Sequence, residues 1–202
     1  MLGLPLPSTL NNNNVTMKFI KRTILTILIL MTVGLLFRGY IYRHIVTYKS
    51  VGQRQNYSVI DDKLIDYIEM NLGDKKDLDI KNIIEIGLSR TSKQLNFTAS
   101  KNDNDPNKLI NSKTAHCVGY SSFYATTCNY LLKKNNLADI WTAKPQIGQI
   151  FLFGINIHKY FKSSFFKDHD FVTIENKITG KVFAVDPTIN DYLYIDYITY
   201  EK

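Results

Sequence analysis

The stretch HDFVTIENKITGKVFAVDPT, from His169 to Thr188, decides the fold of this chain. Both of its halves are rich in β-branched and aromatic residues, and the segment between them contains Gly180. Two strands joined by such a short turn form a β-hairpin. One register sets apolar residues opposite one another, pairing Val172 with Val185 and Ile174 with Phe183. The sequence therefore predicts an antiparallel hairpin in this register.

The register has a chemical consequence for two polar residues, His169 at the start of the first strand and Asp186 at the end of the second. In this register, or in one shifted by two residues, both side chains lie on the same face of the sheet. A carboxylate in that position can hold the imidazole by its distal N–H, which leaves the other ring nitrogen free to deprotonate a thiol. The pair therefore predicts part of a catalytic site.

Cys117 is the candidate nucleophile. It follows a polar segment and begins a helix predicted over 117–132, whose apolar stripe includes Cys128. A thiol in the first turn lies in the positive field of the helix N-terminus, which favours the nucleophilic thiolate. Cys128 is interpreted as a buried structural thiol. The two cysteines lie about 16 Å apart along one helix, which excludes a disulfide between them.

Other residues could compete for these roles. His158 is a rival base, but no acid follows it on a paired strand. Asp170 is a rival partner for His169, but strand alternation points it to the opposite face. A metal site built from His116, Cys117, His158 and His169 lacks the usual ligand spacing. No metal ion and no other cofactor is therefore predicted.

The order of the predicted elements indicates an α+β domain. Apolar residues at helical spacing predict helices over 61–72 and 79–94, and Asp105 with Pro106 begins a short helix before the one at Cys117. Strands are expected after these helices, at 140–143, 149–153, 170–174, 181–185 and 192–197. Helices first and strands second favour a layer of helices against an antiparallel sheet.

Three stretches resemble the transglutaminase-like superfamily, the papain-related group with the order Cys, His, Asp. They are DPNKLINSKTAHCVGYSS at 105–122, HDFVTI at 169–174 and VFAVDPT at 182–188. The family pattern has a Cys at the start of a core helix, an aromatic residue two after the His, and an Asp before Pro-Thr. Phe171 stands where Trp is commoner, and His116 where Gly often precedes the Cys. The resemblance covers about residues 75–190 and implies a papain-like core.

The resemblance implies acyl chemistry on an amide or peptide, so a protein or peptide substrate is the expected partner. Cys117 would attack the carbonyl to give a thioester, His169 would act as base and then as acid, and Asp186 would orient His169. Water or an amine would resolve the thioester, giving hydrolysis or transamidation. The backbone N–H of Cys117 is a candidate oxyanion donor. The alternative is a non-catalytic module of the same fold that binds a peptide or protein at the membrane.

The N-terminal region predicts a membrane segment. Residues 1–16 are polar and low in complexity, and we expect a disordered tail there. Residues 17–45 hold the uncharged run 23–37 between basic flanks, and Arg38 can reach the interface to extend the run to about twenty residues. This predicts a single transmembrane helix as an uncleaved anchor, with a cleaved signal peptide as the alternative. Residues 46–60 would then be a juxtamembrane linker and 61–202 the transglutaminase-like domain.

The excess of positive charge lies in the N-terminal region of the chain. The formal net charge is +7, no acidic residue precedes Asp61, and the remainder has equal numbers of acidic and basic residues. A nucleic-acid-binding protein carries its basic residues on the folded domain, so no nucleic-acid partner is expected. The basic arm suits anionic lipid instead. We expect the domain on the outer side of the membrane, because a single anchor with a short leading tail usually leaves the large domain outside. The sequence predicts no oligomeric state.

Overall fold

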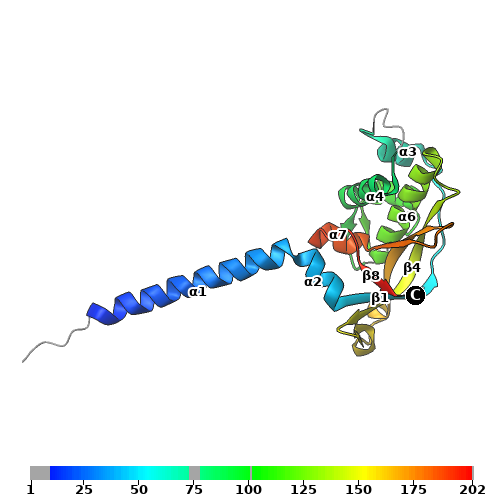
Figure 1. The fold of residues 1–202 in the computed structure, drawn as a ribbon. Helices are drawn as coiled ribbons and strands as arrows, with labels where there is room; N and C mark the ends of the chain where they lie inside the picture. Colours follow the sequence, from blue (N-terminus) through cyan, green and yellow to red (C-terminus); the bar gives the residue numbers. More distant parts are fainter. Residues whose placement is uncertain (1–9, 73–77, 101, 202) are drawn as a thin grey trace, which may run out of the picture. The chain divides into compact units, whose positions relative to one another are not determined.

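The protein is described by a computed structural model, which covers residues 10–72, 78–100 and 102–201 (Figure 1). The chain forms two compact units, the first ending at Ile41 and the second beginning at Tyr42. The first unit is helical, and the second contains both helices and a sheet. The predicted α+β class with a preceding apolar helix is confirmed.

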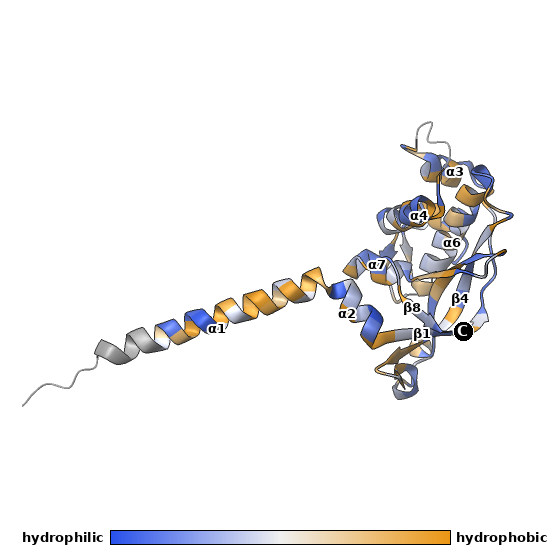
Figure 2. Cartoon of the chain, viewed as in Figure 1, coloured by the Kyte–Doolittle hydropathy of each residue, from blue (hydrophilic) through white to orange (hydrophobic). Residues whose placement is uncertain are grey.

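The first unit contains α1 (Leu10–Leu36) and the beginning of α2 (Arg38–Ile45). The 21 residues from Thr16 to Leu36 are long and apolar enough to cross a membrane. They span about 31 Å, close to the thickness of a hydrocarbon core. Figure 2 shows most of this run in orange, with blue basic residues near its start. Helix α1 begins at Leu10, so the disordered tail expected over 1–16 is wrong for residues 10–16. Residues 1–9 lie outside the described residues.

A six-stranded sheet forms one layer of the second unit, in the order β7-β6-β4-β1-β8 with β5 paired to β4. Its strands are β1 (Val46–Gln53), β4 (Trp141–Leu152), β5 (Ile155–Asn156), β6 (His169–Asn176), β7 (Val182–Val185) and β8 (Thr199–Glu201). All neighbouring strands are antiparallel except β1 and β8, which are parallel. The segments predicted as two strands, 140–143 and 149–153, are parts of the single long strand β4.

The segment 46–60, predicted to be a linker, instead supplies β1 to the interior of the sheet. Strand β1 lies between β4 and β8. Val46 and Tyr48 are buried, whereas Thr47 and Lys49 are partly exposed, which is the alternation of a half-buried strand. The linker prediction was wrong because this period of two was not recognised. The folded unit therefore begins near Tyr42 and not at residue 61.

Helices form the second layer, against the sheet. They are α3 (Asp62–Glu69), α4 (Ile80–Gln94), α5 (Pro106–Ser112), α6 (Cys117–Lys134) and α7 (Pro187–Leu193), with the short 3₁₀ helices η1 (Ile157–Tyr160) and η2 (Ser164–Phe166). The predicted starts of α3, α4 and α5 are confirmed, because Asp61, Asp79 and Asp105 each cap the first turn with a side-chain oxygen. Two short parallel strands, β2 (Asn96–Phe97) and β3 (Thr114–Ala115), lie before α6.

The hairpin has the register expected from the sequence, with Val172 opposite Val185 and Ile174 opposite Phe183. The strand expected over 192–197 is wrong. Its first two residues end α7, and Tyr194 closes that helix in the left-handed conformation, with a φ of 53°. Aromatic residues favoured a strand by propensity, but Asp186 and Pro187 begin a helix immediately after β7.

Helix α6 lies at the centre of the second unit, between the sheet and α4 (Figure 1). Gly87 allows α4 to approach α6 closely, because a Cβ there would lie 2.8 Å from the Cys128 Sγ and 2.8 Å from the Tyr124 ring. Cys128 is completely buried, as its interpretation as a structural thiol requires. The same helix carries Cys117 at its other end.

Candidate active site

Cys117 is the first residue of α6, where the sequence predicted the helix to begin. The preceding residue, His116, caps the helix, and its Nδ1 accepts a hydrogen bond from the Val118 N–H at 3.3 Å. The N–H of Cys117 belongs to the first turn and has no acceptor within the helix. Cys117 keeps 8% of its surface exposed, whereas Cys128 keeps none. Both cysteines are buried, and only Cys117 retains any exposed surface.

His169 and Asp186 form a hydrogen-bonded pair at the ends of β6 and β7. The Nε2 of His169 lies 2.7 Å from Oδ2 of Asp186. The His169 side chain is 19% exposed and that of Asp186 is completely buried. The other carboxylate oxygen, Oδ1, accepts hydrogen bonds from the backbone N–H groups of Thr188 and Ile189 and so caps α7. The predicted same-face arrangement of His169 and Asp186 is present.

The thiol of Cys117 joins this pair. Burial by itself would raise its pKa, but the side chains of His116 and His169 and the backbone N–H of Asp170 interact with the sulfur and lower the pKa from 9.0 to about 7. The Asp186 carboxylate and the thiol raise the pKa of His169 well above its usual value, against the opposing effect of burial. The structure therefore brings the three residues named from the sequence into one chain of interactions.

Two tyrosines extend this chain, and neither was recognised in the sequence. Tyr48 is completely buried on β1 and donates from Oη to Oδ2 of Asp186 at 2.8 Å. The Oη atoms of Tyr42 and Tyr48 lie 2.6 Å apart. Since a phenol has one proton and Tyr48 gives its own to Asp186, Tyr42 is the donor in this second bond. The alternating pattern of β1 is the sequence signal that could have identified Tyr48.

The rival residues are engaged elsewhere. Asp170 points away from His169 and accepts two hydrogen bonds from Arg54, at 2.8 and 3.1 Å. His158, in η1, pairs through Nδ1 with the carbonyl oxygen of Phe166 at 2.7 Å. His116 was considered only as a metal ligand and as a departure from the family pattern, but it also lowers the pKa of the neighbouring thiol. Among the residues that the structure describes, no group of three or more His, Cys, Asp or Glu side chains could hold a metal ion.

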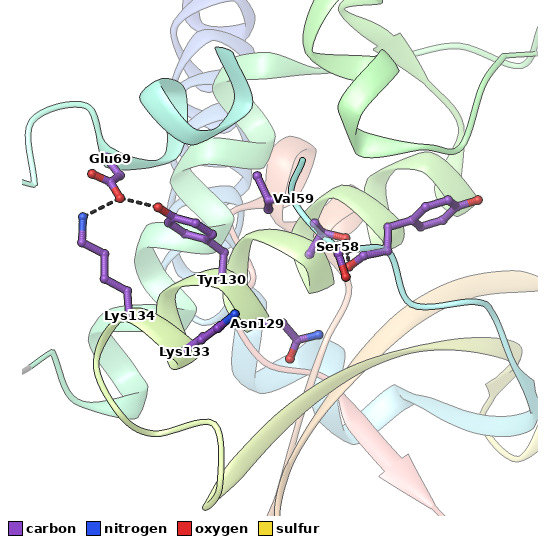
Figure 3. A pocket seen from close by; sticks show the side chains of 9 residues that line it. Ser58, Val59, Glu69, Asn129, Tyr130, Lys133 and Lys134 are labelled. Carbon is purple, nitrogen blue, oxygen red and sulfur yellow. Dashed lines mark hydrogen bonds and ion pairs between the residues drawn. The ribbon is translucent and has the colours of Figure 1, made fainter. Parts of the chain in front are cut away.

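Two cavities of about 560 Å³ each occur elsewhere in the second unit, and neither is lined by the three candidate residues. The first lies along the C-terminal half of α6 and is lined by Tyr57, Ser58, Val59, Glu69, Thr126, Asn129, Tyr130, Lys133 and Lys134 (Figure 3). In this cavity Glu69 accepts a hydrogen bond from Tyr130 and pairs with Lys134. The second is lined by Tyr57, Asn102, Asp103 and Asn104.

No protein-family model, no curated protein and no solved structure matches this chain. The resemblance to the transglutaminase-like superfamily therefore depends on the three sequence stretches alone.

Proposed function

We propose that the protein is a membrane-tethered cysteine enzyme of the transglutaminase-like type, which cleaves or transfers the acyl group of an amide in a protein or peptide. One observation carries the proposal. A thiol at a helix N-terminus, with a pKa of about 7, interacts with His169, whose Nε2 is bonded to the buried carboxylate of Asp186. A nucleophile, a base and a residue that orients the base are the minimal set for covalent acyl chemistry.

The proposed reaction begins with Cys117 as thiolate and His169 as imidazolium. The Cys117 thiolate attacks the carbonyl carbon of the amide, and the developing oxyanion is stabilised by the N–H of Cys117. His169, as imidazolium, donates its Nδ1 proton to the departing amine, and the C–N bond breaks to leave a thioester. Neutral His169 then takes a proton from water or an amine, which attacks the thioester carbonyl. The products are an acid or a new amide, and the thiolate–imidazolium pair is regenerated.

The transglutaminase-like core is also part of the proposal. The order of a Cys at a helix start, a His at a strand start and an Asp after the next strand supports it, together with the packing of α6 against β4 and β6. His116, at the position where the family pattern often has Gly, lowers the pKa of the thiol. This difference supports a modified site in which a second imidazole faces the sulfur.

The membrane anchor is proposed on the length and composition of α1, with the second unit on the outer side. The 21-residue apolar run supports an anchor, but a signal peptide has the same features. The mass of the protein purified from membranes distinguishes the two. A protein that retains α1 and resists carbonate extraction has the anchor, whereas loss of the first forty or so residues shows a signal peptide.

The catalytic proposal is tested with the full chain in detergent or lipid discs, incubated with a peptide library rich in glutamine and a dansyl-labelled primary amine. We expect dansyl incorporation, or deamidated and cleaved peptides, together with an acyl adduct on Cys117 in the mass spectrum. The Cys117→Ala variant should lose every product. Cys128→Ala is the matched control, since it removes the other thiol of the same helix and should keep the activity. Equal turnover by Cys117→Ala and the wild type would refute the proposal.

The second candidate is the non-catalytic binding module, and the position of the first cavity favours it. Thr126 and Lys134 line that cavity, about 14 and 26 Å along α6 from Cys117. A module that binds a peptide there would have no need of the thiol. Peptide binding that survives Cys117→Ala but is lost when Asn129 and Tyr130 are replaced, without any turnover in the wild type, would establish this alternative.

A further inference from the structure

The connection between β4 and β6 exposes an unusual number of large apolar side chains. We call residues 152–167 the aromatic loop. Its exposed apolar members are Leu152, Phe153, Ile155, Tyr160, Phe161 and Phe166. A contiguous segment of this kind on the surface marks a site of interaction with a protein or a membrane.

The tip of the aromatic loop places a phenylalanine in a backbone conformation that this residue type rarely adopts. Phe153 and Gly154 are the two residues between β4 and β5, and both have positive φ angles, of 49° and 79°. A two-residue hairpin with positive φ at both positions normally uses Asn-Gly or Asp-Gly. A bulky aromatic residue is strained in this conformation, yet Phe153 is 73% exposed and gains little from packing. A strained, exposed phenylalanine points to a function at the loop tip.

The charges of the aromatic loop suit an anionic surface. Lys159, Lys162 and Lys167 are exposed, and none forms an ion pair with another described residue. The loop contains no acidic residue, and Asp168, which follows it, pairs with Arg54. Lysines interleaved with Phe and Tyr are typical of segments that lie in the interface of a bilayer with anionic lipid. A protein-binding surface does not require this combination.

The loop tip also lies where the chain enters the second unit. The N–H of Phe153 donates to the carbonyl oxygen of Ile45 at 2.9 Å, and Val46 is paired with Leu152 (Figure 1). Only nine residues separate Val46 from Leu36, the end of the apolar run of α1. A membrane that holds α1 is therefore within reach of the loop.

We propose that the aromatic loop is a second membrane contact, which inserts Phe153 and its neighbouring aromatic side chains into the interface of an anionic bilayer. This inference rests on the proposed anchor for bringing the second unit to the membrane. Two contacts fix the second unit against the bilayer, whereas a single helix leaves it free to turn. Phe165 packs against Phe97 on β2, whose partner strand β3 ends two residues before Cys117. The loop therefore couples the lipid surface to the region around the thiol.

The test uses the full chain in phosphatidylcholine vesicles, with and without phosphatidylglycerol. The protein has a single tryptophan, Trp141, which is replaced by Phe to keep its stacking on Phe183. Phe153→Trp then places one fluorophore at the loop tip. Ile178→Trp is the matched control, because Ile178 is 75% exposed and lies in the turn at the other end of β4, roughly 35 Å away. Lipids brominated on their acyl chains quench only a tryptophan that reaches the bilayer.

We expect several-fold stronger quenching at position 153 than at position 178, increased by phosphatidylglycerol and reduced when the three lysines are replaced by glutamine. Equal quenching at both positions, or none at position 153, overturns the proposal. A tryptophan at position 153 whose emission is blue-shifted but which brominated lipid does not quench also overturns it, because a protein partner or a second copy then covers the loop. Carbonate extraction tests the proposed anchor separately. If carbonate removes the protein from vesicles in which the tryptophan at position 153 had been quenched, the anchor is refuted and the membrane contact of the loop stands.

Discussion

Tyr48 donates a hydrogen bond to the buried Asp186 carboxylate at 2.8 Å, although 138 residues separate the two in the chain. The accepting atom, Oδ2, is the same oxygen that lies 2.7 Å from Nε2 of His169. The second oxygen caps α7. The hydrogen bonds of the Asp186 carboxylate therefore come from three elements, β1, β6 and α7, and the carboxylate has little freedom to move. Such a carboxylate can hold the imidazole in one orientation, which is what the proposed chemistry requires.

Replacing Tyr48 by Phe should lower the free energy of unfolding by about 1.5–3 kcal/mol, because a buried carboxylate loses a donor. Chemical denaturation of the purified protein measures this change. Tyr67→Phe is the control, since it removes a similar hydroxyl that donates to the carbonyl oxygen of Arg90 at 2.8 Å. A hydrogen bond to an uncharged acceptor contributes only about 1 kcal/mol. Equal losses in the two variants would contradict the role given to Tyr48.

The alkylation rate of Cys117 should rise with pH around a midpoint of about 7, because the thiolate is the reacting form and the pKa is lowered to that value. Below the midpoint the thiol is protonated and slow, and well above it the rate becomes constant. Cys128 should remain unmodified across the same range, since burial raises its pKa to about 12. Iodoacetamide labelling followed by peptide mass spectrometry measures both rates. A midpoint near 9, or faster labelling of Cys128, would argue against the proposed site.

Asp186→Asn should move the alkylation midpoint of Cys117 upward by about 1 unit or more, because the charge that favours the His169 imidazolium is lost. Asparagine can still cap α7, so the helix should remain in place. The same pH series of labelling rates measures the shift. Asp79→Asn removes a charge from another helix cap and should leave the midpoint at its wild-type value. A shift of equal size in both variants would show a general electrostatic effect.

Gly148→Ala should destabilise the protein by about 1–3 kcal/mol and reduce the labelling of Cys117 at pH 7. A Cβ at this position would lie 2.6 Å from the His169 carbonyl oxygen and 2.6 Å from the Phe171 ring, so β6 must shift where His169 begins it. Gly52→Ala is the control, because its nearest neighbour is a flexible Ile147 side-chain atom at 3.3 Å. Thermal unfolding together with labelling measures both effects. Unchanged labelling in Gly148→Ala would show that the thiol does not depend on the position of His169.

The sequence by itself determined the features that depend on neighbours along the chain. Alternation of apolar residues set the register of the β6–β7 hairpin, because a slip by one residue would turn every buried side chain to the other face. Aspartates before apolar helical patterns marked the starts of α3, α4 and α5, because capping is a contact within one turn. The order of Cys117, His169 and Asp186 along helix and strands was predicted from the same local signals.

Only the tertiary structure decided which distant segments meet. Strand β1 pairs with β4 about a hundred residues later, and local patterns carry no information about such a partner. That pairing puts Tyr48 beneath Asp186 and turns a presumed linker into part of the sheet. Residues 192–197 have the composition of a strand, but the helix begun at Asp186 and Pro187 occupies the start of that segment.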